Sequence, residues 1–306
     1  MISRPIEKLV PRHFYLKSIK VLDDYIGPYI ERTLALDEYE LDKLSKSDTS
    51  FTFLHALASY TRDPKVIRDQ LMYVLCCCSS VCDIINTNQR NRAVFLAGRD
   101  TTAATLSWCL YELAHYPATY AKLRNEVIQV VGPDKEPTYD DLKNMRYLQH
   151  TLNEALRLYP AVPFNVRYAL TDTSLPSAVP GVPDVSVVAG DAVFYSTLSM
   201  QRRPELYPPP SPEFADPALF SPDRWDHWQP KAWAYVPFNG GPRICVGQNF
   251  ALTEMAYVLV RLLQKYERVE YRGDWHAQFH KVEIVGTPGH GVPIAMWKAK
   301  RDEVKA

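Results

Sequence analysis

The chain has 306 residues, of which 46% are hydrophobic and 23% charged, and both values are typical of a globular protein. Lys and Arg together number 35, as do Asp and Glu. This balance argues against nucleic acid as a partner, because nucleic-acid binding favours a basic excess. The N-terminus has no apolar signal-peptide core, and no apolar run reaches the roughly 20 residues that span a bilayer. The sequence therefore predicts a soluble or peripheral protein, with no membrane anchor in this chain.

Most of the chain carries the apolar spacing of amphipathic helices. The clearest long helix is predicted over 93–115, where Pro117 ends it. Gly132 and Pro133 are expected to end the next helix, and the run that starts at Thr138 is typical of a capped helix start. The spacing predicts helices over 21–36, 51–60, from 64 through Leu71, 93–115, 118–131, from 138, 148–158 and 248–266.

The β signal is weaker and comes mostly after residue 160. Short β-prone pieces occur at 185–188 and 192–195, and residues 282–297 are expected to form a short hairpin. Seven prolines between 203 and 223 exclude regular helix and central strand there. That segment is either a packed meander or a loose linker. The prediction is a mainly α protein with a minor β sheet.

The most specific segment is the loop 237–247, which contains Cys245 (PFNGGPRICVG). A free cysteine is often a small apolar core residue. Here, however, glycines surround it and a predicted helix begins directly afterwards, so the helix N-terminus would stabilise a thiolate. Arg243 suits a carboxylate partner, and Phe238 could shield the sulfur. The combination favours an anionic sulfur that binds a metal.

The pattern Phe238-x-x-Gly241-x-Arg243-x-Cys245-x-Gly247 resembles the haem-ligand loop of the cytochrome P450 family. The resemblance implies that Cys245 is the axial ligand of the iron in haem b. A thiolate ligand pushes electron density onto iron and favours O–O cleavage.

A second segment, Ala97–Thr102, lies inside the predicted helix 93–115. Glycine in a helix interior costs about 1 kcal/mol relative to alanine, and the simplest explanation is that Gly98 makes room for a neighbouring side chain. The segment also resembles the distal helix of the same family. The resemblance implies that Gly98 leaves space over the haem and that Asp100 and Thr101 manage protons. Thr102 could share that role, since the sequence does not distinguish the two hydroxyls.

Three charged residues complete the resemblance. Glu154 and Arg157 are three residues apart on one helix face, which alone predicts an exposed ion pair worth at most about 1 kcal/mol. With Arg224 downstream, they resemble the family's Glu-x-x-Arg pair and the arginine of its Pro-rich meander, which implies a structural role. Arg167 is either a solvated arginine at a strand edge or, by the resemblance, a ligand of a haem propionate.

The resemblance covers most of residues 15–300 and implies one partial cytochrome P450 domain over 1–306, N-terminally truncated. Within it, 203–225 would be the Pro-rich meander and 237–247 the haem-ligand loop. One segment, at about 73–92, does not fit the family pattern. We interpret it as a foreign insertion, and a metal cluster on Cys76, Cys77 and Cys78 is the competing interpretation, although the ligand spacing is poor for zinc.

The implied function is that of a haem-thiolate monooxygenase. The segments look most like the fungal branch that oxidises alkanes and fatty acids, with a small lipophilic substrate, O2 and an NADPH-dependent flavoprotein reductase as partners. Substrate contacts are expected near Val162, Phe164 and the loop 286–292. The family's usual location is the cytosolic face of the endoplasmic reticulum membrane. Two alternatives stay open: a haem-thiolate peroxide isomerase or dehydratase, and a catalytically incompetent fragment.

Overall fold

The structure, a computed structural model, describes residues 24, 27–46, 53–67, 93–177, 179–211 and 214–299. The segment at 73–92, with Cys76, Cys77 and Cys78, lies outside the described residues, and so does Leu71. The chain divides into two units, residues 1–97 and 98–306. In the described part of the chain, no helix is both long and apolar enough to cross a membrane.

The first unit contains short helices. Residues 27–34 and 64–67 are helical, and between them lie α2 (Glu38–Ser45) and α3 (Phe53–Tyr60). Asp37 begins α2 with a capping box, in which its side chain accepts from the Glu40 N–H and the Glu40 side chain accepts from the Asp37 N–H. The helices share a small core of Ile30, Leu41, Ala58 and Ile67. The helix predicted over 51–60 is confirmed for the residues that the structure describes.

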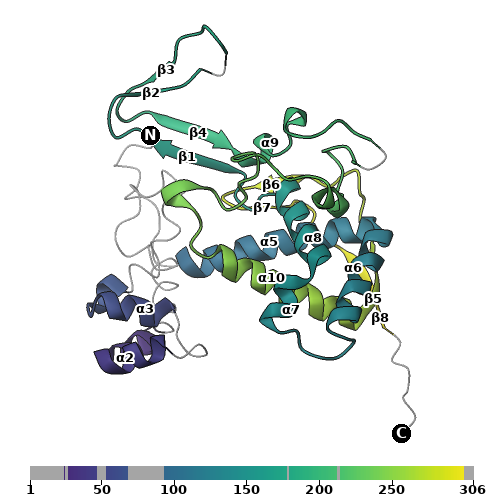
Figure 1. The fold of residues 1–306 in the computed structure, drawn as a ribbon, viewed down its shortest axis with the longest axis horizontal. Coiled ribbons are helices and arrows are strands. Elements are labelled where there is room, and N and C mark those ends of the chain that lie inside the picture. Colours follow the sequence, from purple (N-terminus) through teal and green to yellow (C-terminus); the bar gives the residue numbers. More distant parts are fainter. Residues whose placement is uncertain are drawn as a thin grey trace, which may run out of the picture. The chain divides into compact units, whose positions relative to one another are not determined.

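The longer helices are as predicted, within a few residues. They are α5 (Ala93–His115), α6 (Pro117–Val130), α7 (Tyr139–Asn144), α8 (Arg146–Leu158) and α10 (Gln248–Lys265), with a short α9 (Thr197–Met200) (Figure 1). The local signals explain their ends. Gly132 adopts φ +93° and donates its N–H to the Val127 carbonyl at 3.3 Å, which closes α6. Thr138 and Asp141 form a capping box at the start of α7.

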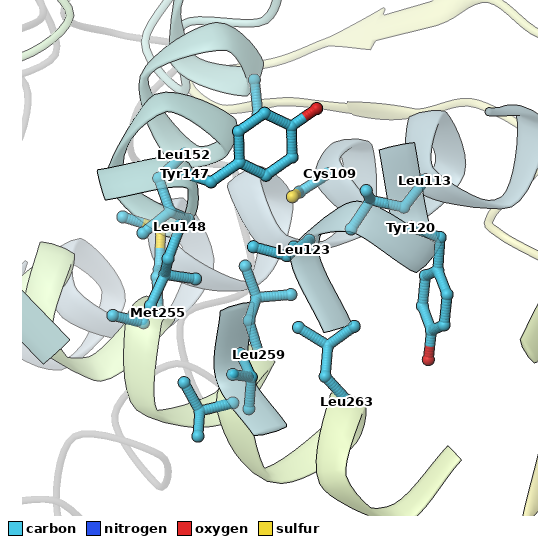
Figure 2. Packing of buried hydrophobic residues seen from close by; sticks show 14 of the residues in the cluster. Cys109, Leu113, Tyr120, Leu123, Tyr147, Leu148, Leu152, Met255, Leu259 and Leu263 are labelled. Atoms are coloured by element: carbon cyan, nitrogen blue, oxygen red, sulfur yellow. The ribbon is translucent and has the colours of Figure 1, made fainter. Parts of the chain in front are cut away.

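The main core lies where α6, α7, α8 and α10 pack against one another and against the C-terminal half of α5. Figure 2 shows apolar side chains from these helices pointing toward one another, among them Leu123 of α6, Leu148 of α8 and Leu259 of α10. All three are 0% exposed. This core packs α8, which carries Glu154 and Arg157, against α10, which follows directly after the loop with Cys245.

Where the structure describes the chain, the strands form four antiparallel pairs instead of one sheet. The pairs are β1 (Phe164–Tyr168) with β4 (Ala192–Ser196), β2 (Thr173–Leu175) with β3 (Val185–Val187), β5 (Tyr266–Tyr271) with β8 (Ile294–Lys298), and β6 (His280–Val282) with β7 (Gly286–Pro288). The predicted hairpin over 282–297 is therefore wrong in its pairing. Its second half, β8, pairs instead with β5, a strand that the sequence analysis does not predict and that begins at Tyr266, directly after α10. The helix predicted over 248–266 includes only the first residue of this strand.

The seven-proline segment packs against the rest of its unit. It contains two 3₁₀ turns, η5 (Pro204–Leu206) and η6 (Pro222–Asp226), and an isolated bridge between Ser211 and Phe214. Tyr207 and Phe214 from this segment are buried together with Trp228. Prolines remove backbone donors, so the segment depends on side chains for its order.

A buried carboxyl group lies in the C-terminal half of α5. Glu112 is 4% exposed, and Tyr159 donates its hydroxyl to Glu112 Oε1 at 2.5 Å. Trp108 stacks on the Tyr159 ring, with 4.0 Å between the ring centroids. Burial raises the pKa of Glu112 to about 7, although the Tyr159 hydrogen bond acts in the opposite direction.

This raised pKa predicts a pH-dependent stability. The folded state binds the proton of Glu112 more tightly than the unfolded state does, so the contribution is fully present below pH 4.5 and is lost as the pH rises to about 7. In the native chain, we expect this group to lower the unfolding free energy by roughly 3 kcal/mol between pH 4.5 and pH 8. In Glu112→Gln, which has no carboxyl group to titrate there, this decrease should be absent. Urea unfolding at several pH values measures this. Glu136→Gln, in the exposed loop after α6, is the control, and equal pH slopes for both variants would contradict the assignment.

Candidate functional site

The loop before α10 holds Cys245 in a closed turn. The 3₁₀ turn η7 (Gly241–Arg243) precedes it, and Ile244 donates its N–H to the Gly241 carbonyl at 3.1 Å. Cys245 donates its own N–H to the Phe238 carbonyl at 2.9 Å. The thiol is free and half-buried. The cysteine and the residue before it are thus held by backbone hydrogen bonds.

The shape of this loop explains its glycines. Gly241 adopts φ +67°, a left-handed conformation that favours glycine. A Cβ atom at Gly240 would lie 2.4 Å from Cζ3 of Trp233, so the tryptophan ring packs directly on the glycine backbone. Asn239 and Trp233 also adopt positive φ, at +61° and +68°. Asparagine tolerates this conformation better than most residues do, whereas a bulky residue such as tryptophan is strained in it.

The start of α10 gives the sulfur a positive electrostatic environment. Gly247 is the N-cap of α10 and supplies no side-chain hydrogen bond, so side chains do not cap the first N–H groups there. The positive end of the helix dipole lies at this point and stabilises an anion. Ile244, Val246 and Phe250 are 48%, 65% and 68% exposed, which makes the surroundings of the cysteine apolar. Phe238 is half-buried and packs against the main core.

Two side chains that sequence analysis missed tie the loop to the rest of the unit. Gln201, which is 0% exposed, accepts from the Val236 N–H at 2.9 Å and donates to the Leu156 and Arg157 carbonyls, both at 3.1 Å. Asn239 bonds to the β1–β4 pair through its side-chain amide. Gln201 carries no signal in the sequence, since it lies outside every motif. Asn239 lies inside the motif, at a position that the pattern leaves open.

Arg167 and Asn165 lie two residues apart on β1 and therefore project from the same face of the strand. The Arg167 guanidinium lies 5.4 Å from the Tyr195 ring centroid and donates to the Val166 carbonyl at 2.9 Å. Among the residues that the structure describes, no carboxylate pairs with Arg167. Asn165 is 2% exposed, and its Nδ2 is buried with no hydrogen-bond partner. The strand thus carries a half-buried cation without a carboxylate partner in the described chain, and an amide donor that is enclosed in the interior. Arg243, at the end of η7, is exposed.

The second predicted segment forms one turn of α5. A Cβ atom at Gly98 would have no other described atom within 4 Å, so the glycine does not make room for a neighbouring side chain. The Thr102 hydroxyl donates to the Gly98 carbonyl and is thus engaged within the helix. The Asp100 side chain is 45% exposed and lies 3.9 Å from the Arg99 Nε. Thr101 is half-buried, and its carbonyl accepts from the Thr105 hydroxyl at 2.9 Å.

Glu154, Arg157 and Arg224 meet in the interior, and all three are 0% exposed. Glu154 Oε2 accepts from Arg157 Nε at 2.8 Å and from Trp225 Nε1 at 3.0 Å. Glu154 Oε1 accepts from Arg224 Nε at 2.8 Å and from the Ser221 N–H at 2.9 Å. The spacing alone predicts an exposed ion pair between Glu154 and Arg157, and this prediction is wrong because the pair is buried. One carboxylate instead holds two buried guanidinium groups.

The two guanidinium groups also hold the Pro-rich segment. Arg157 donates to the Pro217 carbonyl at 2.8 Å, and both arginines donate to the Leu219 carbonyl. Arg224 further donates to the Ala215 and Asp216 carbonyls, at 3.1 and 3.0 Å. Side chains of α8 and η6 thus supply donors to a backbone that has few partners of its own.

One of the regions expected to contact substrate lies close to the end of α8. The Gly286 N–H donates to the Ala161 carbonyl at 2.9 Å, and the Gly286 carbonyl accepts from Trp108 Nε1 at 3.1 Å. The structure therefore brings residue 286 beside residue 161, next to Val162. Phe164, at the start of β1, is 51% exposed.

Comparison with known proteins agrees with this geometry. A family model described as cytochrome P450 matches residues 83–288. The chain belongs to the cytochrome P450 family. Among its relatives, the cytochrome P450 monooxygenase pvhE of Talaromyces variabilis is 46% identical over 98% of this chain and 52% of that protein. Cytochrome P450 52A13 of Debaryomyces hansenii is 39% identical over 85% of this chain and 46% of that protein. The predicted family and its fungal character are confirmed.

The solved structures support the same fold. The crystal structure of the cytochrome P450 CYP102L1 matches with a TM-score of 0.62 at 22% identity, over 89% of this chain and 56% of that one. At this identity the likeness concerns the fold alone. The predicted cytochrome P450 fold is confirmed, and the chain spans about half the length of the curated relatives that it matches.

The interior cluster of this P450 generates a stability prediction. We expect Glu154→Ala to lower the unfolding free energy by about 3–5 kcal/mol, because it leaves two buried guanidinium groups without a counter-charge. Glu205→Ala is the matched control. Glu205 pairs with Arg203 where both side chains are exposed, at 68% and 62%, so solvent screens the pair and its loss should change the unfolding free energy far less than the loss of Glu154. Urea unfolding followed by circular dichroism compares the two, and similar losses would show that Glu154 does not brace the interior.

Proposed function

We propose that this chain forms the haem-thiolate part of a cytochrome P450 monooxygenase, with Cys245 as the axial ligand of the haem b iron. The observation that carries the proposal is the setting of the thiol: half-buried, in a hydrogen-bonded loop, at the start of a helix that a glycine caps. Among the described residues, His, Cys, Asp and Glu do not gather in a group of three or more that could hold a metal ion. A single sulfur suits a metal whose other ligands belong to a cofactor.

The surrounding residues fit a flat apolar group with carboxylate side chains. Ile244, Val246 and Phe250 offer exposed apolar surface beside the cysteine. Arg167, without a carboxylate partner in the described chain, suits a propionate. Open space beside Gly98 suits a group that lies against α5. These features support haem binding through contacts that packing alone does not require.

When bound, the haem supplies the activation of O2 that no amino-acid side chain provides. In this proposal Cys245 would bind the iron through its sulfur at the start of α10, and Arg243 and Arg167 would hold the propionates. Gly241 and Gly247 allow the backbone to approach the macrocycle closely, and Phe238 fixes the loop to the core. Asp100 exchanges protons with solvent, and the Thr101 hydroxyl passes them on. Thr102 takes a lesser part, because its proton already binds the Gly98 carbonyl.

The resemblance stated from the sequence extends the proposal to substrate, partners and location. One oxygen atom from O2 enters a small lipophilic molecule of the alkane or fatty-acid class, and the other leaves as water. An NADPH-dependent flavoprotein reductase supplies the electrons. Residues near Val162, Phe164 and 286–292 contact the substrate. Residues 1–306 form part of one such domain, and the enzyme works at the cytosolic face of the endoplasmic reticulum membrane.

The ligand assignment predicts the outcome of one substitution. The chain is expressed with haem supplied, reduced and exposed to carbon monoxide, and its absorption spectrum is recorded. We expect the strongly red-shifted Soret band of thiolate-ligated haem in the native chain and its complete loss in Cys245→Ala. Cys109→Ala is the matched control, because Cys109 is a fully buried thiol in the main core, and this variant should keep the band.

Two results would contradict the proposal. An unchanged band in Cys245→Ala would show that another group binds the iron. Absence of haem from the native chain would favour the incompetent fragment. Where haem binds, turnover with reductase compared with turnover by peroxide alone separates a monooxygenase from a peroxide isomerase.

A further inference from the structure

The side chain of Asn239 joins the cysteine loop to a strand pair that is distant in sequence. Asn239 Nδ2 donates to Asn165 Oδ1 at 3.0 Å, and the Tyr195 hydroxyl donates to Asn239 Oδ1 at 2.9 Å. Asn165 lies on β1 and Tyr195 on β4, where they are directly opposed in the antiparallel register. One amide thus bonds to both members of a cross-strand pair, using its donor and its acceptor.

The backbone of Asn239 is equally constrained. It adopts φ +61°, and its N–H donates to the Val236 carbonyl at 3.0 Å. The preceding carbonyl, that of Phe238, accepts the N–H of Cys245. A rotation of the backbone at Asn239 therefore displaces the Phe238 carbonyl and releases the hydrogen bond that positions the cysteine.

The partner of Asn239 is a rigid one. Asn165 is 2% exposed and lies within the five-residue β1–β4 ladder. A buried side chain of this kind has little rotamer freedom and is a fixed reference for the loop. Gln201 fixes the loop too, but at Val236, before the left-handed turn. Of these two side chains, Asn239 alone lies inside the turn that leads to Cys245.

We propose that Asn239 is a positioning residue, whose amide holds the left-handed turn against β1–β4 and so limits the opening of the Cys245 loop. The consequence for the iron rests on the proposed function. The consequence for the thiol does not, because it concerns the hydrogen bonds of the chain itself. The two can therefore be tested separately.

The first experiment uses the full chain without haem. Iodoacetamide alkylates the protein, and peptide mass spectrometry measures the rate at each cysteine, with the buried Cys109 as internal reference. Asn239→Gly removes the amide but retains the left-handed backbone. Asn165→Ala removes its partner, and the double variant tests whether the two act through one hydrogen bond. Tyr195→Phe deletes a single hydroxyl and provides a milder test should the asparagine variants fold poorly.

We expect Asn165→Ala to raise the alkylation rate of Cys245 roughly five- to tenfold, the equivalent of one net hydrogen bond in an opening equilibrium. Asn239→Gly also loses the bond from Tyr195 and should raise the rate at least as much. The double variant should react no faster than Asn239→Gly alone, because that substitution already removes the bond to Asn165. Tyr195→Phe should give a smaller increase. Rates within twofold of the native chain in all variants, or single effects that multiply in the double variant, would overturn the proposal.

The second experiment adds haem, reductant and carbon monoxide. We expect Asn239→Gly to retain haem but to show a smaller fraction of the red-shifted Soret band than the native chain, because the sulfur is held less firmly. A full band in Asn239→Gly would count against the positioning role. A native chain that takes up no haem would contradict the proposed function alone, since the alkylation rates would still decide the role of Asn239.

Discussion

The Glu154 carboxylate holds two arginine guanidinium groups in a region where none of the three side chains is exposed. Such a cluster is expensive to bury, and it persists only when every lone pair and donor has a partner. Here the carboxylate accepts from Arg157 and Arg224, and the guanidinium groups donate to carbonyls of the Pro-rich segment. The cluster therefore fixes the path of a backbone that helix and sheet cannot organise.

The backbone held by this cluster is connected to the cysteine loop. Gln201 donates to the carbonyl of Arg157 and accepts from the N–H of Val236, so one buried amide links the end of α8 to the start of the loop. From there, backbone bonds and Asn239 define the turn that ends at Cys245. Successive polar contacts thus connect the interior to the loop that positions the thiol.

The sequence predicted the long helices well because their signals are local. Pro117, Gly132 and Thr138 each act within one turn, and the structure places helix boundaries beside all three. Strand pairing is a non-local property, and β5 escaped prediction because its residues continue directly from α10. The motif residues could be named from their pattern. Gln201 could not, because its role depends on three backbone groups from two distant segments, and only the fold brings these together.

The interior of this protein and its proposed haem site differ in whether their polar groups have hydrogen-bond and charge partners. The cluster around Glu154 is fully paired, as a buried charge requires. Around the cysteine loop, other features gather instead: an arginine without a carboxylate in the described chain and exposed apolar side chains that follow and precede the cysteine. The Asn165 Nδ2 donor lacks a hydrogen bond too, but it is enclosed in the interior, as His280 Nε2 is, and so indicates no ligand. A cation, a thiol and apolar surface along one loop and one strand are together better explained by a ligand that is flat, apolar and carries carboxylates.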